Sequence, residues 1–324
     1  MKIKLKLVVD QALHFYKWEQ PFFNKEFELV DSPGDDVVVL AFGPDVLERA
    51  AEMPALKRVA LLFPGFGFNP YHNPETKKKV IDLIERKYDA VLVNPGPVEE
   101  ALKETRKTYC HPFSINVDQI LKYKKIRKNL NSLIHVSANA PQKDWERSRA
   151  VMELSGLKYE VFPPRSSAVG EDSRKGTWSE RLSWRYNKYI TTRISPHTAF
   201  IRQNGYVSHK HIIKKYLEYD GFIHIASEKN LPQHLDGKYT ASLFEAGLSG
   251  SIVFWHDTFN LGNDFETVFS VSKDPQVAAN EIKEIRANLD IERHSKMTSE
   301  EIAERCEPRS IVEFRRQVIE SLLD

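Results

Sequence analysis

The stretch from Asp236 to Trp255 (DGKYTASLFEAGLSGSIVFW) has residue types that suit an anionic ligand. Its Asp-Gly start predicts a turn, the run Thr240–Leu248 predicts a short helix, and Gly250 is placed to end that helix. Ser251–Trp255 then predicts a buried strand. Because the first turn of a helix carries N–H groups without partners and a partial positive charge, the start of this helix is a candidate phosphate site.

The side chains around this helix start would add to the binding of phosphate oxygens. Lys238 carries a full positive charge, and Thr240 and Ser242 carry hydroxyl groups. The candidate binding residues are Gly237, Lys238, Tyr239, Thr240, Ala241, Ser242 and Glu245. Donors fixed in place here would also stabilise the charge that grows on a departing diphosphate. Two alternatives stay open: Ser242 and Glu245 have the spacing of a capping box, and Lys238 is a solvated surface lysine.

A second candidate region follows an apolar run, Arg58–Phe63. The segment Pro64–Pro70 (PGFGFNP), followed by Tyr71 and His72, is rich in glycine and aromatic residues. It would suit the lining of a ligand pocket, with aromatic rings such as Phe66 against sugar or base faces and His72 as a candidate base; the alternatives are a packed turn and an exposed histidine. The segment is not a dinucleotide fingerprint, because its Gly-x-Gly lacks a third glycine and an immediate helix.

A third region, Pro163–Pro196, mixes basic residues with Trp178, Trp184, Tyr186 and Tyr189. This mixture fits contact with an anionic acceptor or with nucleic acid. The alternative is a solvated helix with an aromatic core face. A stretch of this length without structure would be unusual in a compact domain, so function or a helix is expected.

These candidate residues need a scaffold, and the apolar pattern predicts one. Short apolar runs alternate with amphipathic segments, which predicts parallel sheets with crossover helices and therefore an α/β fold. Predicted strands are the N-terminal MKIKLKLVVDQ and residues 37–41, 58–63, 90–93, 132–136, 159–162, 198–202, 222–226 and 251–255. Predicted helices are 45–53, 75–87, 98–106, 145–154, 209–219, 240–248, 310–323 and one reaching Arg305 from a capping box at Thr298 and Glu301.

The chain length and one break in this pattern predict two domains. At 324 residues, two domains are each large enough to bury a core. A basic connector, Lys122–Asn131, interrupts the alternation, so we place the boundary there: 1–128 and 129–305, followed by a C-terminal helix, 306–324. Ligands of open parallel sheets bind beyond the carboxyl ends of the strands, which places the Asp236 turn at such an edge.

Composition narrows the class of protein. The formal net charge of +2 gives no overall sign of a nucleic-acid partner. The two cysteines, Cys110 and Cys306, have no metal-ligand spacing, and so few cysteines favour a reduced, cytoplasmic location. The N-terminal residues predict a strand rather than a signal peptide, and no uninterrupted apolar stretch has the length of a membrane span, which leaves peripheral membrane contact open.

The order of motifs in the second half resembles the C-terminal domain of GT-B glycosyltransferases, in particular glycosyltransferase family 4. The corresponding segments, in order, are Gly205–Val207, Gly221–Ala226, Glu245–Gly250 (EAGLSG), Ser251–Phe254, Gly262–Glu266 and Asp274–Pro275. In the first half, His111–Asp118 (HPFSINVD) is similar to the family's domain junction, without its glycine. The resemblance covers about residues 36–290 and rests on collinear order.

The resemblance implies two Rossmann-like doubly wound domains that face a cleft, with the last helix crossing back to the first domain. It implies a nucleotide-diphosphate sugar donor on the C-terminal domain, held by Lys143, Lys238, Thr240, Ser242 and Glu245, with Glu245 on the ribose hydroxyls. The candidate catalytic residues are Lys143, Lys238, Glu245 and His72. The acceptor, a glycan, a lipid or another hydroxyl compound, would lie near Phe66 and His72; nucleic acid is less favoured. A retaining outcome and independence of metal and other cofactors are also expected.

The sequence departs from the family at several positions. The family often has a second glutamate eight residues before the one matched by Glu245, but Gly237 stands there and Asp236 is one residue too early. Ala138 replaces the arginine that accompanies the family's lysine, which Lys143 matches. Two other functional classes therefore stay open. One is a GT-B sugar-nucleotide epimerase, and the other is a catalytically inactive module that binds sugar or nucleic acid.

Overall fold

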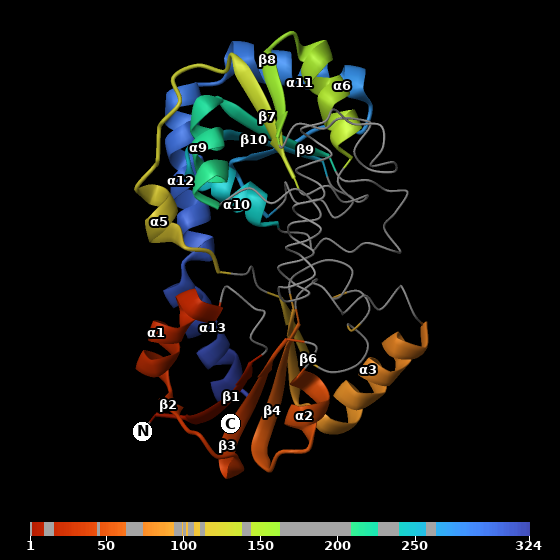
Figure 1. Ribbon diagram of the computed structural model, residues 1–324, viewed down its shortest axis with the longest axis vertical. Helices are drawn as coiled ribbons and strands as arrows, with labels where there is room; N and C mark the ends of the chain where they lie inside the picture. The colour runs from red at the N-terminus through yellow and green to blue at the C-terminus, as the bar shows by residue number, and fades with distance from the viewer. Residues whose placement is uncertain are drawn as a thin grey trace, which may run out of the picture. The chain divides into compact units, whose positions relative to one another are not determined.

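The computed structural model describes residues 2–9, 16–43, 46–62, 74–93, 99, 102, 107–110, 114–137, 144–162, 209–225, 240–256 and 264–324. These residues form two parallel sheets with helices packed on them (Figure 1). Grouping by contacts gives two compact units. One unit consists of Met1–Lys122, Glu228–Leu248 and Glu300–Asp324, and the other of Tyr123–Ser227 and Ser249–Ser299.

The first sheet has six strands in the order β2-β1-β3-β4-β5-β6, and every pairing is parallel. The central strands are continuous apolar runs because a parallel sheet with helices on both sides buries both of its faces. The strands are β1 (Lys4–Val9), β2 (Glu28–Leu29), β3 (Gly34–Phe42), β4 (Ala55–Leu62), β5 (Ala90–Val93) and β6 (Lys107–Cys110).

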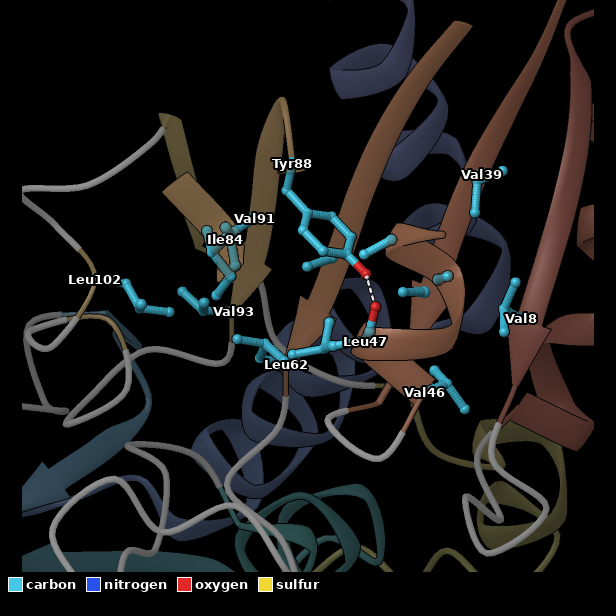
Figure 2. Packing of buried hydrophobic residues seen from close by; sticks show 14 residues of the cluster. Val8, Val39, Val46, Leu47, Leu62, Ile84, Tyr88, Val91, Val93 and Leu102 are labelled. Carbon is cyan, nitrogen blue, oxygen red and sulfur yellow. Dashed lines mark hydrogen bonds between the residues drawn. The ribbon is translucent and has the colours of Figure 1, made fainter. Parts of the chain in front are cut away.

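Two separate apolar clusters cover the two faces of this sheet. Helices α2 (Leu47–Ala51) and α3 (Pro74–Lys87) contribute to one cluster. Figure 2 shows that cluster, in which the buried Tyr88 hydroxyl donates a hydrogen bond of 2.6 Å to the Leu47 carbonyl. Helices α1 (Tyr16–Glu26) and α13 (Pro308–Glu320) contribute to the other cluster.

The C-terminal helix α13 returns to the N-terminal sheet, as expected. Its Val312, Val318 and Ile319 are buried with the apolar residues of β1, β3 and β4. Arg315 on the same helix is fully buried and forms an ion pair with Glu19 of α1, which is also fully buried. The helix is therefore held by an apolar face and by one buried charge pair.

The second sheet has five strands in the order β11-β10-β9-β7-β8, again all parallel. Helices α6 (Trp145–Ser155) and α11 (Pro275–Asn288) pack on the face that carries Ile223 and Phe254. On the other face, Tyr216 of α9 (His209–Glu218) contacts Phe222 edge-on. The strands are β7 (Ser132–Val136), β8 (Lys158–Phe162), β9 (Gly221–Ile225), β10 (Ile252–His256) and β11 (Val268–Ser270).

Both sheets wind in the same way. In each, the first strand lies between the second and the third, and later strands continue outward on the side of the third. This is a doubly wound order, and its topological switch point lies between the first and third strands. The predicted α/β class with two doubly wound sheets is confirmed, whereas the boundaries 1–128, 129–305 and 306–324 stay predictions.

One predicted helix start is wrong. Helix α12 begins at Ile291 and runs to Cys306, so Thr298 lies in its interior rather than at its N-terminus. The Thr298 hydroxyl donates to the carbonyl of His294 within the helix, at 3.0 Å, instead of capping a helix start. The spacing of Thr298 and Glu301 was misleading because threonine and glutamate three residues apart also occur in the interior of amphipathic helices.

Other elements were not predicted from the pattern of the sequence. These are α1, which contains Pro21, α5 (Val117–Leu121), and the short strands β2, β6 and β11; α11 was indicated only by the family resemblance at Asp274–Pro275. The predicted strand at 198–202 and most of the predicted helix at 98–106 lie outside the described residues. Within the described ranges, no helix combines the length and apolar character needed to cross a membrane.

The two thiols should differ in reactivity. Cys306 at the end of α12 is fully buried, and its burial raises the pKa of its thiol well above the ordinary value, whereas Cys110 at the end of β6 is half-buried. Since the thiolate is the reactive form, we expect a disulfide reagent at pH 8 to label Cys110 first and Cys306 only after unfolding. The Cys110→Ser variant should show no labelling in the native state; native labelling of that variant would contradict the burial of Cys306.

Candidate functional site

Helix α10 (Ala241–Leu248) forms where the sequence predicts it and connects β9 to the neighbouring parallel strand β10. Its first turn contains no acidic residue. The hydroxyl groups of Thr240 and Ser242 are hydrogen-bonded to each other, 2.9 Å apart, beside the first N–H groups of the helix. The predicted helix end at Gly250 is also confirmed, since Gly250 adopts a positive φ of 89°.

The structure brings three of the predicted binding residues together on one face of α10. Ala241, Ser242 and Glu245 are exposed or half-buried, whereas the rest of the helix is buried. Since residues four apart lie on the same side of a helix, Glu245 lies next to the first turn. The alternative capping box is wrong, because the helix begins before Ser242 and places it within the first turn.

Several predicted site residues lie outside the described residues: His72, Lys143, Gly237, Lys238 and Tyr239, together with Phe66 and the basic aromatic stretch 163–196. Their roles stay predictions.

Helix α6, which follows Lys143, has a different kind of N-terminus. Asp144 is its N-cap, and the Asp144 carboxylate accepts a hydrogen bond of 3.0 Å from the N–H of Arg147. The carboxylate therefore already supplies a negative charge to this helix end, and a second anion there would be repelled. Among the described residues, the first turn of α10 is the better anion site of the two, because it contains hydroxyl groups and no acidic residue.

The switch point of the second sheet is marked by a histidine. The Nδ1 of His135, on β7, lies 3.0 Å from the carbonyl oxygen of Ile223 on β9, and its Nε2 lies 2.8 Å from the Ser137 hydroxyl. A carbonyl oxygen only accepts, so in the neutral ring Nδ1 carries the proton and the Ser137 hydroxyl donates to Nε2. The ring thus joins β7 to β9 beyond their last paired residues, Ile134 and Phe222.

Two more rings continue from His135 across this edge of the sheet. His224 of β9 stacks on Trp255 of β10 with ring centroids 4.3 Å apart, and on His135 with centroids 5.5 Å apart. All three are next-to-last residues of their strands, and all three are buried. They form a rigid layer at the carboxyl end of the strands, where ligands of such sheets bind.

Sequence reasoning did not identify these three residues as part of the site. A partial signal was present, because His135, His224 and Trp255 each lie within the last three residues of a predicted strand. The residue types alone did not identify the site, since the order of the strands decides which ends are neighbours. Only the sheet order β10-β9-β7 brings the three rings next to each other.

An open cavity of about 460 Å³ lies at the amino end of the strands of the second sheet, beside the residues that precede β7. Its charged residues are mixed in sign and include Lys128, Arg286, Asp290 and Glu292. It therefore offers no clear preference for a charged ligand. Among the described residues, no group of three or more histidine, cysteine or acidic side chains is placed to hold a metal ion.

No protein-family model matches this sequence, and no curated protein matches it either. Solved structures match over most of the chain. HepE from Anabaena, in complex with UDP-glucose, has a TM-score of 0.56 and 13% identity, and the match covers 99% of this chain and 100% of HepE. The UDP-forming α,α-trehalose-phosphate synthase from Burkholderia xenovorans has a TM-score of 0.56 and 10% identity, with 96% and 79% coverage.

TarM from S. aureus, in a crystal structure that contains UDP, has a TM-score of 0.55 and 14% identity. That match covers 90% of this chain but 56% of TarM, so the chain spans little more than half of the TarM length. These neighbours are glycosyltransferases with the GT-B fold. The two doubly wound sheets, the return of α13 to the first sheet and these matches together show that this chain has the GT-B fold.

Proposed function

We propose that this protein is a glycosyltransferase that transfers a sugar from a nucleotide-diphosphate donor to a hydroxyl acceptor. The observation that carries the proposal is the first turn of α10, which contains no acidic residue and lies beside Ser242 and Glu245 on the less buried face of the helix. The GT-B fold supports it, and so do neighbouring structures that contain UDP or UDP-glucose.

The chemistry of the helix start fits a diphosphate. The first N–H groups of α10 have no partners within the helix and carry part of the positive end of its dipole. Since one of the hydroxyl groups of Thr240 and Ser242 donates to the other, the pair presents one further O–H donor at the same place. When the glycosidic bond to the diphosphate breaks, negative charge grows on these oxygens, so donors already in position would lower the barrier.

Glu245 is placed for a different part of the donor. It lies one turn into α10, on the same side as the first turn, and is half-buried. Its carboxylate would accept hydrogen bonds from the two ribose hydroxyls, whose distance from the diphosphate suits one helical turn. Lys143 and Lys238 remain proposed phosphate contacts, and His72 a proposed base near the acceptor.

Three finer features belong to the proposal. We propose UDP-sugars as the first donors to test, transfer with retention of the anomeric configuration, and catalysis without a metal ion. Activity that persists in EDTA supports metal independence, and the anomeric form of the product decides between retention and inversion. Product formed without an acceptor by C2 epimerisation of the sugar would instead assign an epimerase.

A donor-binding experiment tests the proposal directly. We expect one class among UDP-, GDP-, ADP- and dTDP-sugars to raise the melting temperature, because a ligand at about 100 times its dissociation constant adds about 2.7 kcal/mol of stability. Glu245→Ala should weaken the shift, while Glu284→Ala, an exposed change on α11, should leave it unchanged. No shift with any donor would contradict the proposal; binding without transfer or hydrolysis would identify a binding module.

A further inference from the structure

Arg127 lies in the basic connector between the predicted domains, yet it is almost fully buried, with 1% of its surface exposed. Its guanidinium donates to four main-chain carbonyl groups: Tyr216 at 2.7 Å, Tyr219 at 2.9 Å, Ser249 at 3.4 Å and Lys125 at short range. Burial lowers the pKa of Arg127 to about 10, with Asp220 acting in the opposite direction, so the side chain stays charged at neutral pH.

Three of these carbonyl groups belong to two helix ends. Tyr216 and Tyr219 lie in and just after the last turn of α9, and Ser249 directly follows α10. The last carbonyl groups of a helix have no partners within it and carry the negative end of its dipole, so a buried cation is stabilised there. Arginine suits this position because its planar group presents several donors in fixed directions, which lysine does not.

Further hydrogen bonds tie the main chain around Arg127 to the turn after α10. The Lys125 N–H donates to the Ser249 carbonyl at 3.0 Å, and the Arg127 N–H donates to the Ser295 hydroxyl at 2.9 Å. The Ser295 hydroxyl in turn donates to the Gly250 carbonyl at 2.6 Å. We name these residues the Arg127 cluster: Lys125, Arg127, Tyr216, Tyr219, Ser249, Gly250 and Ser295.

We propose that Arg127 is a positioning residue for the nucleotide-sugar site, an inference that rests on the proposed function. Arg127 does not touch the donor in this proposal. It fixes the C-terminal end of α10, and α10 is a single short helix whose other end takes the diphosphate. Because the eight residues of α10 move as one rigid element, a fixed C-terminal end keeps the N–H groups at its start in place.

The test measures amide exchange and ligand affinity separately in the full chain. In Arg127→Lys, without ligand, we expect faster hydrogen exchange for the last turn of α10 and for the connector, and unchanged exchange for β3 to β5 of the first sheet. The dissociation constant of UDP would be measured by calorimetry, with GDP, ADP and dTDP in parallel. It should rise about tenfold, which is the lower end of the loss seen when a residue that holds a metal ligand in place is replaced.

The control is Ile282→Ala, which removes a fully buried side chain from the core of the second sheet but leaves the Arg127 cluster intact. It should lower the melting temperature and leave nucleotide affinity unchanged below that temperature. Equal affinities in Arg127→Lys and Ile282→Ala would overturn the proposal and leave Arg127 a purely structural residue. Failure of the unmodified chain to bind any of the four nucleotides would overturn the proposed function and this inference with it, whatever the exchange shows.

Discussion

Replacing Glu19 with glutamine is expected to lower the free energy of unfolding of the N-terminal unit by about 3–5 kcal/mol, the range for removing one partner of a buried ion pair. The change leaves the Arg315 charge buried without its carboxylate. The two side chains are fully buried, with Arg315 Nη2 3.0 Å from Glu19 Oε1 and Nη1 at short range from Oε2. The buried Ser114 hydroxyl also donates to this carboxylate.

The surroundings of Arg315 explain why no other group would replace Glu19. The guanidinium lies over the rings of Phe42, at 5.2 Å, and Phe23, at 5.9 Å, in an apolar cluster. Its Nε is buried and has no hydrogen-bond partner among the described residues. The ring faces stabilise the cation only partly, because a cation–π contact contributes much less than a hydrogen-bonded carboxylate.

Urea unfolding with peptide-resolved hydrogen exchange in α1 and α13 would measure this effect. The matched control is Glu313→Gln on the same helix, where the exposed pair with Arg309 should contribute less than about 1 kcal/mol. A second test is the double variant Glu19→Leu with Arg315→Met, which should recover most of the stability, since it leaves no buried charge unpaired. A loss in Glu19→Gln no larger than in Glu313→Gln would mean that the pair is hydrated in solution.

The sequence pattern was most informative for buried parallel strands. The predicted ranges Ala90–Val93 and Ser132–Val136 agree with β5 and β7 to the residue, because such strands are apolar on both faces and end at polar residues. Short edge strands such as β6 and β11 carry no such pattern. Helix α1 was missed because Pro21 lies inside it, and proline usually marks a helix end.

The candidate site could be predicted only in part, for a related reason. The residues of α10 are close in sequence, so helical periodicity alone places Ser242 and Glu245 on one face. The sequence does not indicate that Arg127 and Arg315 are buried, because their partners lie far along the chain: Glu19 is 296 residues from Arg315, and Ser249 is 122 residues from Arg127. Burial of a charge depends on partners of this kind, which a local pattern does not contain.

Replacing Gly250 with alanine is expected to cost about 2–5 kcal/mol in the second unit. One part is the positive φ of 89°, a conformation that costs a residue with a side chain about 1–2 kcal/mol. The other is steric, because a Cβ here would overlap the Lys125 carbonyl oxygen and approach its carbon at 3.1 Å and the Ser295 hydroxyl at 3.2 Å. Overpacking of this kind typically costs about 1–3 kcal/mol.

The Lys125 carbonyl has little freedom to move away, because it accepts from the Arg127 guanidinium while the Lys125 N–H donates to Ser249. Gly156, at the end of α6, allows the conformational cost to be measured alone. Its φ is also positive, at 71°, but a Cβ there would meet nothing within 4 Å. Gly156→Ala should therefore lose only the conformational part, about 1–2 kcal/mol. Urea unfolding of the second unit would measure the loss of unfolding free energy in both alanine variants. Equal losses would show that the main chain around Lys125 moves away from the added Cβ. A larger loss in Gly250→Ala would show that the Arg127 cluster holds this main chain in place.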